Sequence, residues 1–218
     1  MEKIKIVIVD DHILLRSALA NLINSFENIQ VIFQANNGKD LMEKFSRHEV
    51  PDVLILDLNM PDMDGYETAK WLKDHHPGVH VLMLTMYDSE LTLIRLLQAG
   101  VRGFLKKDVE PNELKFAINS VMNSGYYYST QTAGRLANLF RNSTVVNPRV
   151  QNALMSDQEV EFLKLACSDK TYKEVALAMG LSPRSVDALR DNLFMKLDVK
   201  SRVGLAMVAI RNGVVTMN

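Results

Sequence analysis

One short stretch, residues 53–65, limits what this chain can fold into more than any other. It reads Val-Leu-Ile-Leu-Asp-Leu-Asn-Met-Pro-Asp-Met-Asp-Gly, so a continuous apolar run ends at Asp57. A run between Pro51 and Pro61 is too short for a helix and predicts a central strand covered on both faces. Asp57 would then end that strand, at the edge where open α/β sheets bind ligands. A carboxylate there costs stability unless a cation accompanies it, so Asp57 is either a solvated turn residue or a site.

The same strand-then-helix pattern repeats along residues 1–124. Apolar runs typical of strands occur at 4–9, 29–35, 53–56, 79–84 and 104–105, and apolar residues at helical spacing follow each run. Five such units predict a (βα)5 flavodoxin-like, doubly wound parallel sheet with right-handed crossovers. In the helix after Gly38, the residues expected to face inward are Leu41, Met42 and Phe45.

Polar residues stand where four of these strands end: Asp10, Asp11, Asp57, Thr85 and Lys107. In a doubly wound sheet these strand ends share one edge, so the side chains are expected to converge. Several carboxylates in one place repel one another unless they bind a hard cation, and oxygen ligands suit Mg²⁺. Beside Mg²⁺, the carboxylate of Asp57 can attack phosphorus while Lys107 and Thr85 bind phosphoryl oxygens. The pattern therefore predicts a phosphoryl-transfer site.

The rest of the chain has a different character. Residues 125–152 begin with Gly125 and three consecutive tyrosines and are interpreted as a linker, helical around 132–140. Residues 153–218 predict a small all-α, four-helix domain, in which Ser156 begins a capping box and Ser182-Pro183 begins a later helix. A helix, a turn at Gly180 and a second helix indicate a helix-turn-helix DNA-binding domain.

Composition sets wider bounds on the class of protein. The formal charge of −1 is uneven, because residues 1–124 carry 13 Lys/Arg against 18 Asp/Glu, whereas residues 125–149 carry three Arg and no acid. This order weakly favours a cation-binding front and an anion-binding rear. Cys167 is the single cysteine, which excludes an intrachain disulfide and favours a reducing compartment. We find no signal pattern and no apolar run of the roughly 20 residues that a membrane span needs, so we expect a cytoplasmic protein.

With these positions in register, residues 1–124 resemble the receiver domain of two-component response regulators. The resemblance implies that Asp10 and Asp11 are the acidic pair for Mg²⁺, that Asp57 is the phosphoacceptor, and that Thr85 and Lys107 are the switch threonine and the conserved-type lysine. The segment Gly103-Phe104-Leu105-Lys106-Lys107 is similar to the family's G-[YF]-x-x-K, so Phe104 holds the aromatic switch position. Asn59 would offer its backbone carbonyl to the metal. Asp108 replaces the proline of many receivers, as is typical of the NarL/FixJ branch.

The C-terminal part resembles the LuxR-type helix-turn-helix of that branch. The similar segments are Met155-Ser156-x-x-Glu159-x-Glu161-Phe162-Leu163, Lys173-Glu174-Val175-Ala176, Ser182-x-x-Ser185-Val186 and Lys196-Leu197-x-Val199-Lys200-Ser201-Arg202. The recognition helix would be residues 182–196. The implied DNA-contacting residues are Thr171, Tyr172, Lys173, Ser182, Arg184, Ser185, Val186, Ala188, Leu189, Arg190, Lys196, Lys200 and Arg202. The chain departs from the family's basic pattern at Asp187 and Asp191, where acids would face phosphates.

Together the two resemblances imply a phosphorylation-dependent transcriptional regulator rather than an enzyme. A sensor histidine kinase would phosphorylate Asp57 in the presence of Mg²⁺. The phosphorylated protein would then form a homodimer and bind double-stranded promoter DNA. One alternative is a phosphatase similar to the haloacid dehalogenases, which also use a strand-end aspartate, Mg²⁺, a hydroxyl residue and a lysine. Their second acid, two residues after the nucleophile, is replaced here by Asn59. Another alternative is a receiver that acts without phosphate as an interaction module.

Overall fold

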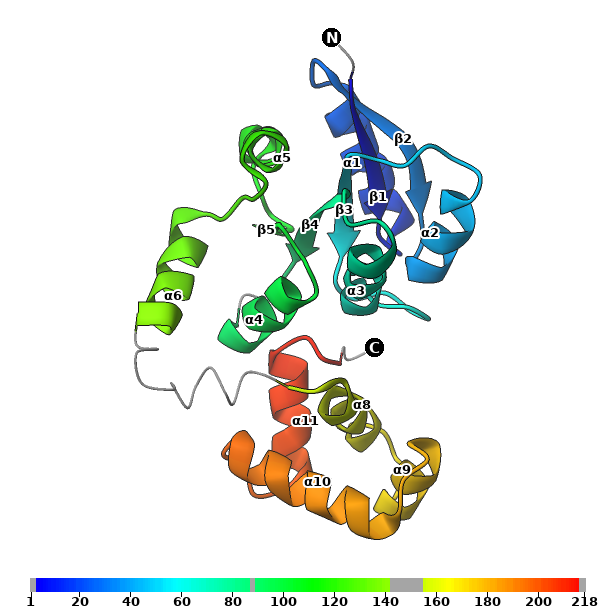
Figure 1. Cartoon of the computed structure of the whole chain (residues 1–218), viewed down its shortest axis with the longest axis vertical. Coiled ribbons are helices and arrows are strands. Elements are labelled where there is room, and N and C mark those ends of the chain that lie inside the picture. Colours follow the sequence, from blue (N-terminus) through cyan, green and yellow to red (C-terminus); the bar gives the residue numbers. More distant parts are fainter. Residues whose placement is uncertain (1–2, 87–88, 142–154, 216–218) are drawn as a thin grey trace. The chain divides into compact units, whose positions relative to one another are not determined.

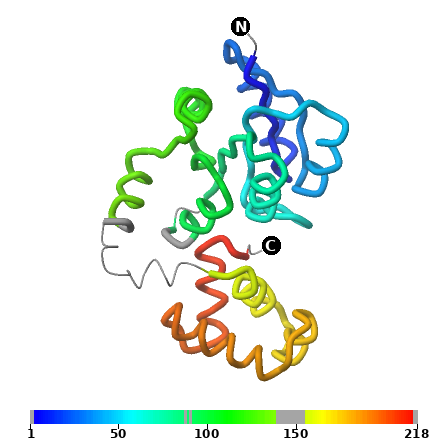
Figure 2. Tube along the Cα trace, viewed as in Figure 1, coloured from blue at the N-terminus to red at the C-terminus, as the bar shows by residue number. Residues whose placement is uncertain are grey.

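The computed structural model describes residues 3–86, 89–141 and 155–215 (Figures 1 and 2). Residues 142–152 of the predicted linker and the first two residues of the predicted C-terminal domain lie outside this range. The chain divides into two compact units, and the division falls within two helices, α4 (Glu90–Gln98) and α6 (Thr130–Arg141).

The first unit is built on a parallel sheet. Its strands are β1 (Ile4–Val9), β2 (Ile29–Ala35), β3 (Val53–Asp57), β4 (His80–Thr85) and β5 (Gly103–Lys106). They lie in the order β2-β1-β3-β4-β5, and every pairing is parallel. This confirms the predicted doubly wound sheet. All five residues of β3 are buried, as expected for a central strand covered on both faces.

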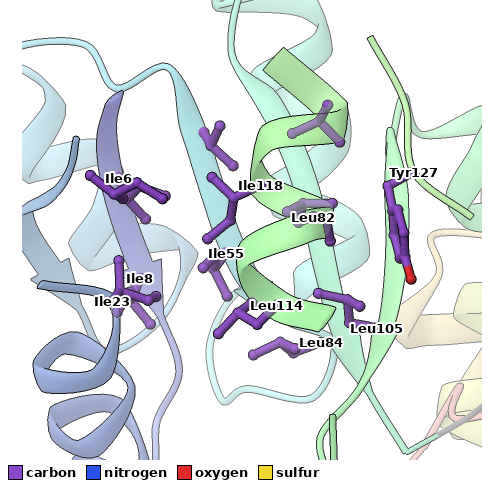
Figure 3. Close-up of a cluster of buried hydrophobic side chains, with 14 of the residues drawn as sticks. Ile6, Ile8, Ile23, Ile55, Leu82, Leu84, Leu105, Leu114, Ile118 and Tyr127 are labelled. Atoms are coloured by element: carbon purple, nitrogen blue, oxygen red, sulfur yellow. The ribbon is translucent and has the colours of Figure 1, made fainter. Parts of the chain in front are cut away.

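Helices connect the strands and cover the sheet. They are α1 (Ile13–Asn24), α2 (Gly38–Phe45), α3 (Gly65–His75), α4 and α5 (Pro111–Ser124), and a further helix α6 (Thr130–Arg141) follows. On one face, α1 and α5 close a hydrophobic core in which Ile23 of α1 and Ile118 of α5 are fully buried against residues such as Ile55 of β3 (Figure 3). This core fixes the sheet whose carboxyl edge carries the polar residues.

The prediction that Met42 faces the core is wrong. Its neighbour Leu41 is fully buried, whereas Met42 is 38% exposed. Successive residues of an α-helix point about 100° apart, and in α2 this rotation leaves Met42 partly outside the face that buries Leu41.

The first residues of the predicted linker continue the first unit. Gly125 adopts a positive φ of 82° and ends α5, which is the conformation that favours glycine after a helix. The Tyr127 N–H then donates to the carbonyl of Arg102 at 2.9 Å, and Tyr127 forms a parallel bridge with Gly103 at the free side of β5. The Tyr127 hydroxyl donates to Glu113 of α5 at 2.8 Å.

The second unit contains α8 (Asp157–Ala166), α9 (Tyr172–Ala178), α10 (Pro183–Lys196) and α11 (Arg202–Arg211), as Figure 1 shows. The capping box predicted at Ser156 is present, and Ser182 accepts from the backbone N–H of Ser185 to cap α10. Gly180, with φ of 64°, makes the turn between α9 and α10. Phe162, Val175 and Leu205 are among the fully buried side chains of its core. No helix among the described residues has the length and apolarity to cross a bilayer.

Candidate functional site

The strand register brings the predicted polar residues to one edge. Val9 pairs with Leu56, so Asp10 and Asp57 follow on neighbouring strands. Asp57 pairs with Leu84, which puts Thr85 one residue further along β4. Thr85 pairs with Lys106, so Lys107 comes just after β5. Side chains from four segments of the chain therefore meet where the parallel strands end.

Lys107 joins the two buried carboxylates of this edge. Its Nζ lies 2.9 Å from Oδ2 of Asp57 and 3.1 Å from Oδ2 of Asp10. The two carboxylates are almost completely buried, with 3% and 1% of their residue surfaces exposed. Burial raises the pKa of Asp57 from 3.8 to about 6, although contact with Lys107 opposes the rise. Burial also lowers the pKa of Lys107, but Asp57 and Asp10 outweigh it and hold that pKa above 10.5.

Asp11 and His12 complete a cluster of possible metal ligands. One ligand atom from each of Asp10, Asp11, His12 and Asp57 lies within 4.8 Å of the others. The Nδ1 atom of His12 is 3.1 Å from Asp10 Oδ1 and 2.9 Å from Asp11 Oδ1. The second approach is not directed as a hydrogen bond, so the buried Asp11 Oδ1 has no donor among the described residues. Three carboxylates, one of them with an unsatisfied oxygen, suit a hard divalent cation.

Two features shape the loop that follows Asp57. The backbone N–H of Asn59 interacts with the Asp57 carboxylate and favours its charged form. Gly65 at the start of α3 donates its N–H to the Leu58 carbonyl at 2.8 Å, and an added Cβ there would lie 2.2 Å from the Asp57 carbonyl oxygen. Only glycine therefore allows the helix to begin this close to the strand end. The metal role of the Asn59 carbonyl stays a prediction.

The aromatic position Phe104 connects this edge to the residues after α5. Phe104 is 5% exposed and Thr85 is 4% exposed, on the neighbouring strands β5 and β4. The Phe104 ring stacks on Tyr128 with a centroid distance of 5.7 Å, and Tyr128 stacks on Tyr126 at 5.8 Å. Sequence reasoning interpreted the tyrosines as linker and missed this stack. The run of three aromatics after the helix-ending Gly125 was the signal that could have revealed it.

In the second unit, α9, the turn and α10 form the helix-turn-helix that the sequence predicted. Of the residues proposed to contact DNA, those with exposed surfaces are Thr171, Lys173, Ser182, Arg184, Ser185, Ala188 and Lys200. Val186 is fully buried in the core and cannot contact DNA, so its place in the predicted set is wrong. Leu189 is partly buried and packs against the same core.

Four other members of the predicted set have partners within the unit. Lys196 donates to both carboxylate oxygens of Glu159 at 2.8 and 2.7 Å. Arg202 donates to two backbone carbonyls near the end of α8. Arg190 and Arg202 lie over the Tyr172 ring, 5.2 and 5.3 Å from its centroid. These contacts give the four residues a structural role within the second unit.

Comparisons with known proteins agree with both units. Residues 6–119 match the family described as response regulator receiver domain, and residues 153–209 match the bacterial regulatory proteins of the luxR family. The chain is 31% identical to response regulator GacA of Pseudomonas syringae pv. syringae over 215 residues, or 97% of this chain and 98% of the relative. It is 30% identical to oxygen regulatory protein NreC of Staphylococcus carnosus, covering 95% and 97% of the two chains.

A solved structure has a similar fold. RcsB of Salmonella enterica serovar Typhimurium, solved with the promoter rprA and a phosphomimetic, matches with a TM-score of 0.70 at 22% identity. The match covers 94% of this chain and 98% of RcsB. At this identity the likeness shows the fold alone. From the two family matches and the full-length relatives, the chain belongs to the response regulators of the NarL/FixJ branch, which join a receiver domain to a LuxR-type helix-turn-helix.

Proposed function

We propose that this protein is a transcriptional regulator controlled by a phosphoryl group on Asp57. The observation that carries the proposal is the position of the Lys107 ammonium between the buried carboxylates of Asp57 and Asp10, at 2.9 and 3.1 Å. A cation held there serves a carboxylate that must accept an anionic group, since it neutralises charge at a site that excludes most water. The donor would be a sensor histidine kinase, as the receiver family implies.

The residues proposed to hold Mg²⁺ are Asp10, Asp11 and Asp57, with the backbone carbonyl of Asn59. The cluster of carboxylates and the unsatisfied oxygen of Asp11 support this assignment. When bound, the metal would neutralise negative charge on the phosphoryl oxygens. His12 keeps Asp10 in place, since its backbone N–H donates to Asp10 Oδ1 at 2.8 Å.

In the proposed transfer, Asp57 is the nucleophile. One carboxylate oxygen forms a bond to phosphorus as the P–N bond of the kinase's phosphohistidine breaks, and the bonding pair stays on the histidine nitrogen. Asp57 is mostly ionised at neutral pH because its pKa is about 6. The Lys107 ammonium would bind one phosphoryl oxygen, and the Thr85 hydroxyl would donate a hydrogen bond to another. The histidine leaves as a neutral imidazole when its other ring nitrogen carries a proton, so neither Asp57 nor Lys107 has to gain or lose one in this step.

The proposed readout starts at Thr85. Movement of its hydroxyl toward the phosphoryl group would open space beside β4, and Phe104 would turn into it, which biases a two-state element. In the resulting state the protein is proposed to form a homodimer and to bind promoter DNA through α10. Arg184 and Ser185, exposed at the start of α10, are the leading candidates to reach base edges, and Lys173 and Lys200 are candidates for phosphates.

The domain boundaries are part of the proposal: a receiver at 1–124, a partly helical linker at 125–152 and a helix-turn-helix domain at 153–218. The matched ranges 6–119 and 153–209 lie inside the two outer segments. RcsB was solved on promoter DNA with a phosphomimetic, and we extend that behaviour to this chain by proposal. Because its proposed target is the bacterial promoter, we propose that the protein works in the cytoplasm.

The test of the phosphoacceptor uses the full chain with acetyl phosphate and Mg²⁺. We expect the intact mass to rise by one phosphoryl group in the wild type and not in Asp57→Asn. The matched control is Asp62→Asn, since Asp62 is an exposed acid of the same loop, with 58% of its side chain accessible. Labelling of Asp57→Asn at the wild-type level would contradict the proposal. Selection of promoter fragments with and without acetyl phosphate then tests the readout.

The two alternative functions predict different results. A phosphatase would turn over a phosphate ester steadily, but Asn59 offers no acid to protonate a leaving group. An interaction module would bind its promoter or partner equally well with and without phosphate. No structural feature of the described residues favours either function over the phosphoacceptor.

A further inference from the structure

The exposed face of α10 carries two acids where a DNA-binding helix usually carries cations. Asp187 and Asp191 are one helical turn apart, with 55% and 61% of their side chains exposed. Arg184 and Ala188 are exposed on the same side of the helix. A carboxylate near the DNA backbone is repelled by phosphates, so an acid on this face weakens binding unless it has a donor in the groove.

A column of stacked side chains holds both acids in place. The rings of Phe162 and Tyr172 are stacked within 9° of parallel, and the Arg190 guanidinium lies over Tyr172. Arg190 then donates to Oδ1 of Asp187 and to Oδ1 of Asp191, each at 2.9 Å. Phe162 is fully buried, so the column is anchored in the core. Arg190 is thus a positioning residue for two carboxylates, which present their remaining lone pairs on the exposed face.

The major groove offers few donors to a carboxylate. Only the exocyclic amino groups of cytosine and adenine donate hydrogen bonds there. Adenine places its N7 acceptor beside that amino group, and a carboxylate would face N7 unfavourably, whereas an asparagine amide satisfies both atoms. Cytosine presents the N4 amino group without an adjacent acceptor of its own. An aspartate on a recognition helix is therefore best matched to cytosine.

The two acids differ in position along the helix. Recognition helices contact base edges mainly through their N-terminal residues. Asp187 lies one turn into α10, close to the cap at Ser182, whereas Asp191 lies one turn further. We propose that Asp187, held by Arg190, determines specificity by accepting a hydrogen bond from the N4 amino group of one cytosine in each half-site. This inference rests on the proposed DNA binding and deepens it.

The test is binding-site selection from a library of random DNA duplexes, using the full-length protein after treatment with acetyl phosphate and Mg²⁺. We expect the wild type to select cytosine at one position of each half-site. Asp187→Asn should select adenine there, because an amide pairs with N6 and N7. Asp187→Ala should select no base at that position and should bind the wild-type site about tenfold more weakly relative to random DNA.

Asp191→Asn is the matched control, since it removes the same charge from the same arginine. It should keep the cytosine preference while binding random DNA more tightly, as loss of any acid near phosphates does. An unchanged preference in Asp187→Ala, or a preference altered only by Asp191→Asn, overturns the inference and leaves DNA binding intact. Failure of the wild type to enrich any sequence contradicts the proposed DNA binding itself. Thermal melting of each variant, expected to match the wild type, verifies that the exposed substitutions leave the fold unchanged.

Discussion

Replacing Asp57 by asparagine should stabilise the first unit at neutral pH when no divalent metal is present. The wild-type carboxylate is 3% exposed and must ionise in a buried position. Its pKa is raised from 3.8 to about 6 even with Lys107 beside it. Asparagine has a similar shape and never ionises, so the variant avoids this cost.

The magnitude follows from the two pKa values. Below pH 3.8 the carboxyl is mostly protonated in both the folded and the unfolded chain, so burying it costs no stability there. Between pH 3.8 and 6 the folded state retains the proton longer, so the free energy of unfolding falls as the pH rises. Above pH 6 the full cost applies, about two pKa units or about 3 kcal/mol. Asp57→Asn should therefore gain about 3 kcal/mol at pH 7.5 and almost nothing near pH 4.

The measurement is urea unfolding in EDTA, followed by tryptophan fluorescence. Trp71 is the only tryptophan of the chain and lies in α3 of the first unit, so its signal reports on this unit. Asp62→Asn serves as the control for loss of an exposed charge. Added Mg²⁺ should raise the stability of the wild type more than that of Asp57→Asn, because the carboxylate is then a ligand. A variant that is no more stable than the wild type at pH 7.5, or a gain that is the same at pH 4, would refute this account of the buried charge.

Three further substitutions test other contacts. Gly65→Ala should disrupt the start of α3, because the added Cβ would lie 2.2 Å from a backbone oxygen at the end of β3. The rate of phosphorylation by acetyl phosphate should fall, and an unchanged rate would contradict this expectation. Lys196→Met should destabilise the second unit by about 1–3 kcal/mol, since Glu159 would lose its ion-pair partner. Thermal melting followed by circular dichroism measures the loss, and Glu159→Gln combined with Lys196→Met should recover part of it. Tyr128→Leu should cost about 0.5–1.5 kcal/mol through loss of the Phe104 stack, and Tyr128→Phe should be neutral in urea unfolding.

The sequence predicted the sheet and the acidic edge because both depend on local patterns. Apolar runs with period-specific spacing identify strands and helices, and the shared edge of parallel strands then brings Asp10, Asp57 and Lys107 together. The Lys107 contacts needed no information beyond strand order. Helix caps such as Ser156 were equally accessible, because a cap is set by residues within one turn.

Contacts between distant segments were not accessible in this way. Val186 was placed among DNA contacts by motif similarity, but the buried side of α10 is fixed by packing against other helices. The pairing of Lys196 with Glu159 joins residues 37 apart, and no spacing rule selects one acid for one lysine. The same holds for Arg190, whose neighbouring acids looked like a departure from the family and prove to be its ion-pair partners.

The short bridge between Tyr127 and Gly103 bears on how the sheet avoids pairing with a strand of another chain. β5 is an outer strand, and an outer strand presents unpaired backbone groups that invite pairing with another chain. The Tyr127 N–H occupies the Arg102 carbonyl on that side, and an added Cβ at Gly103 would lie 2.8 Å from the Tyr127 carbonyl oxygen, so the approach is close. The segment after α5 therefore covers part of the outer edge of β5. A fragment ending at residue 124 would lack this cover, and its β5 edge would be open to pairing with a strand of another chain.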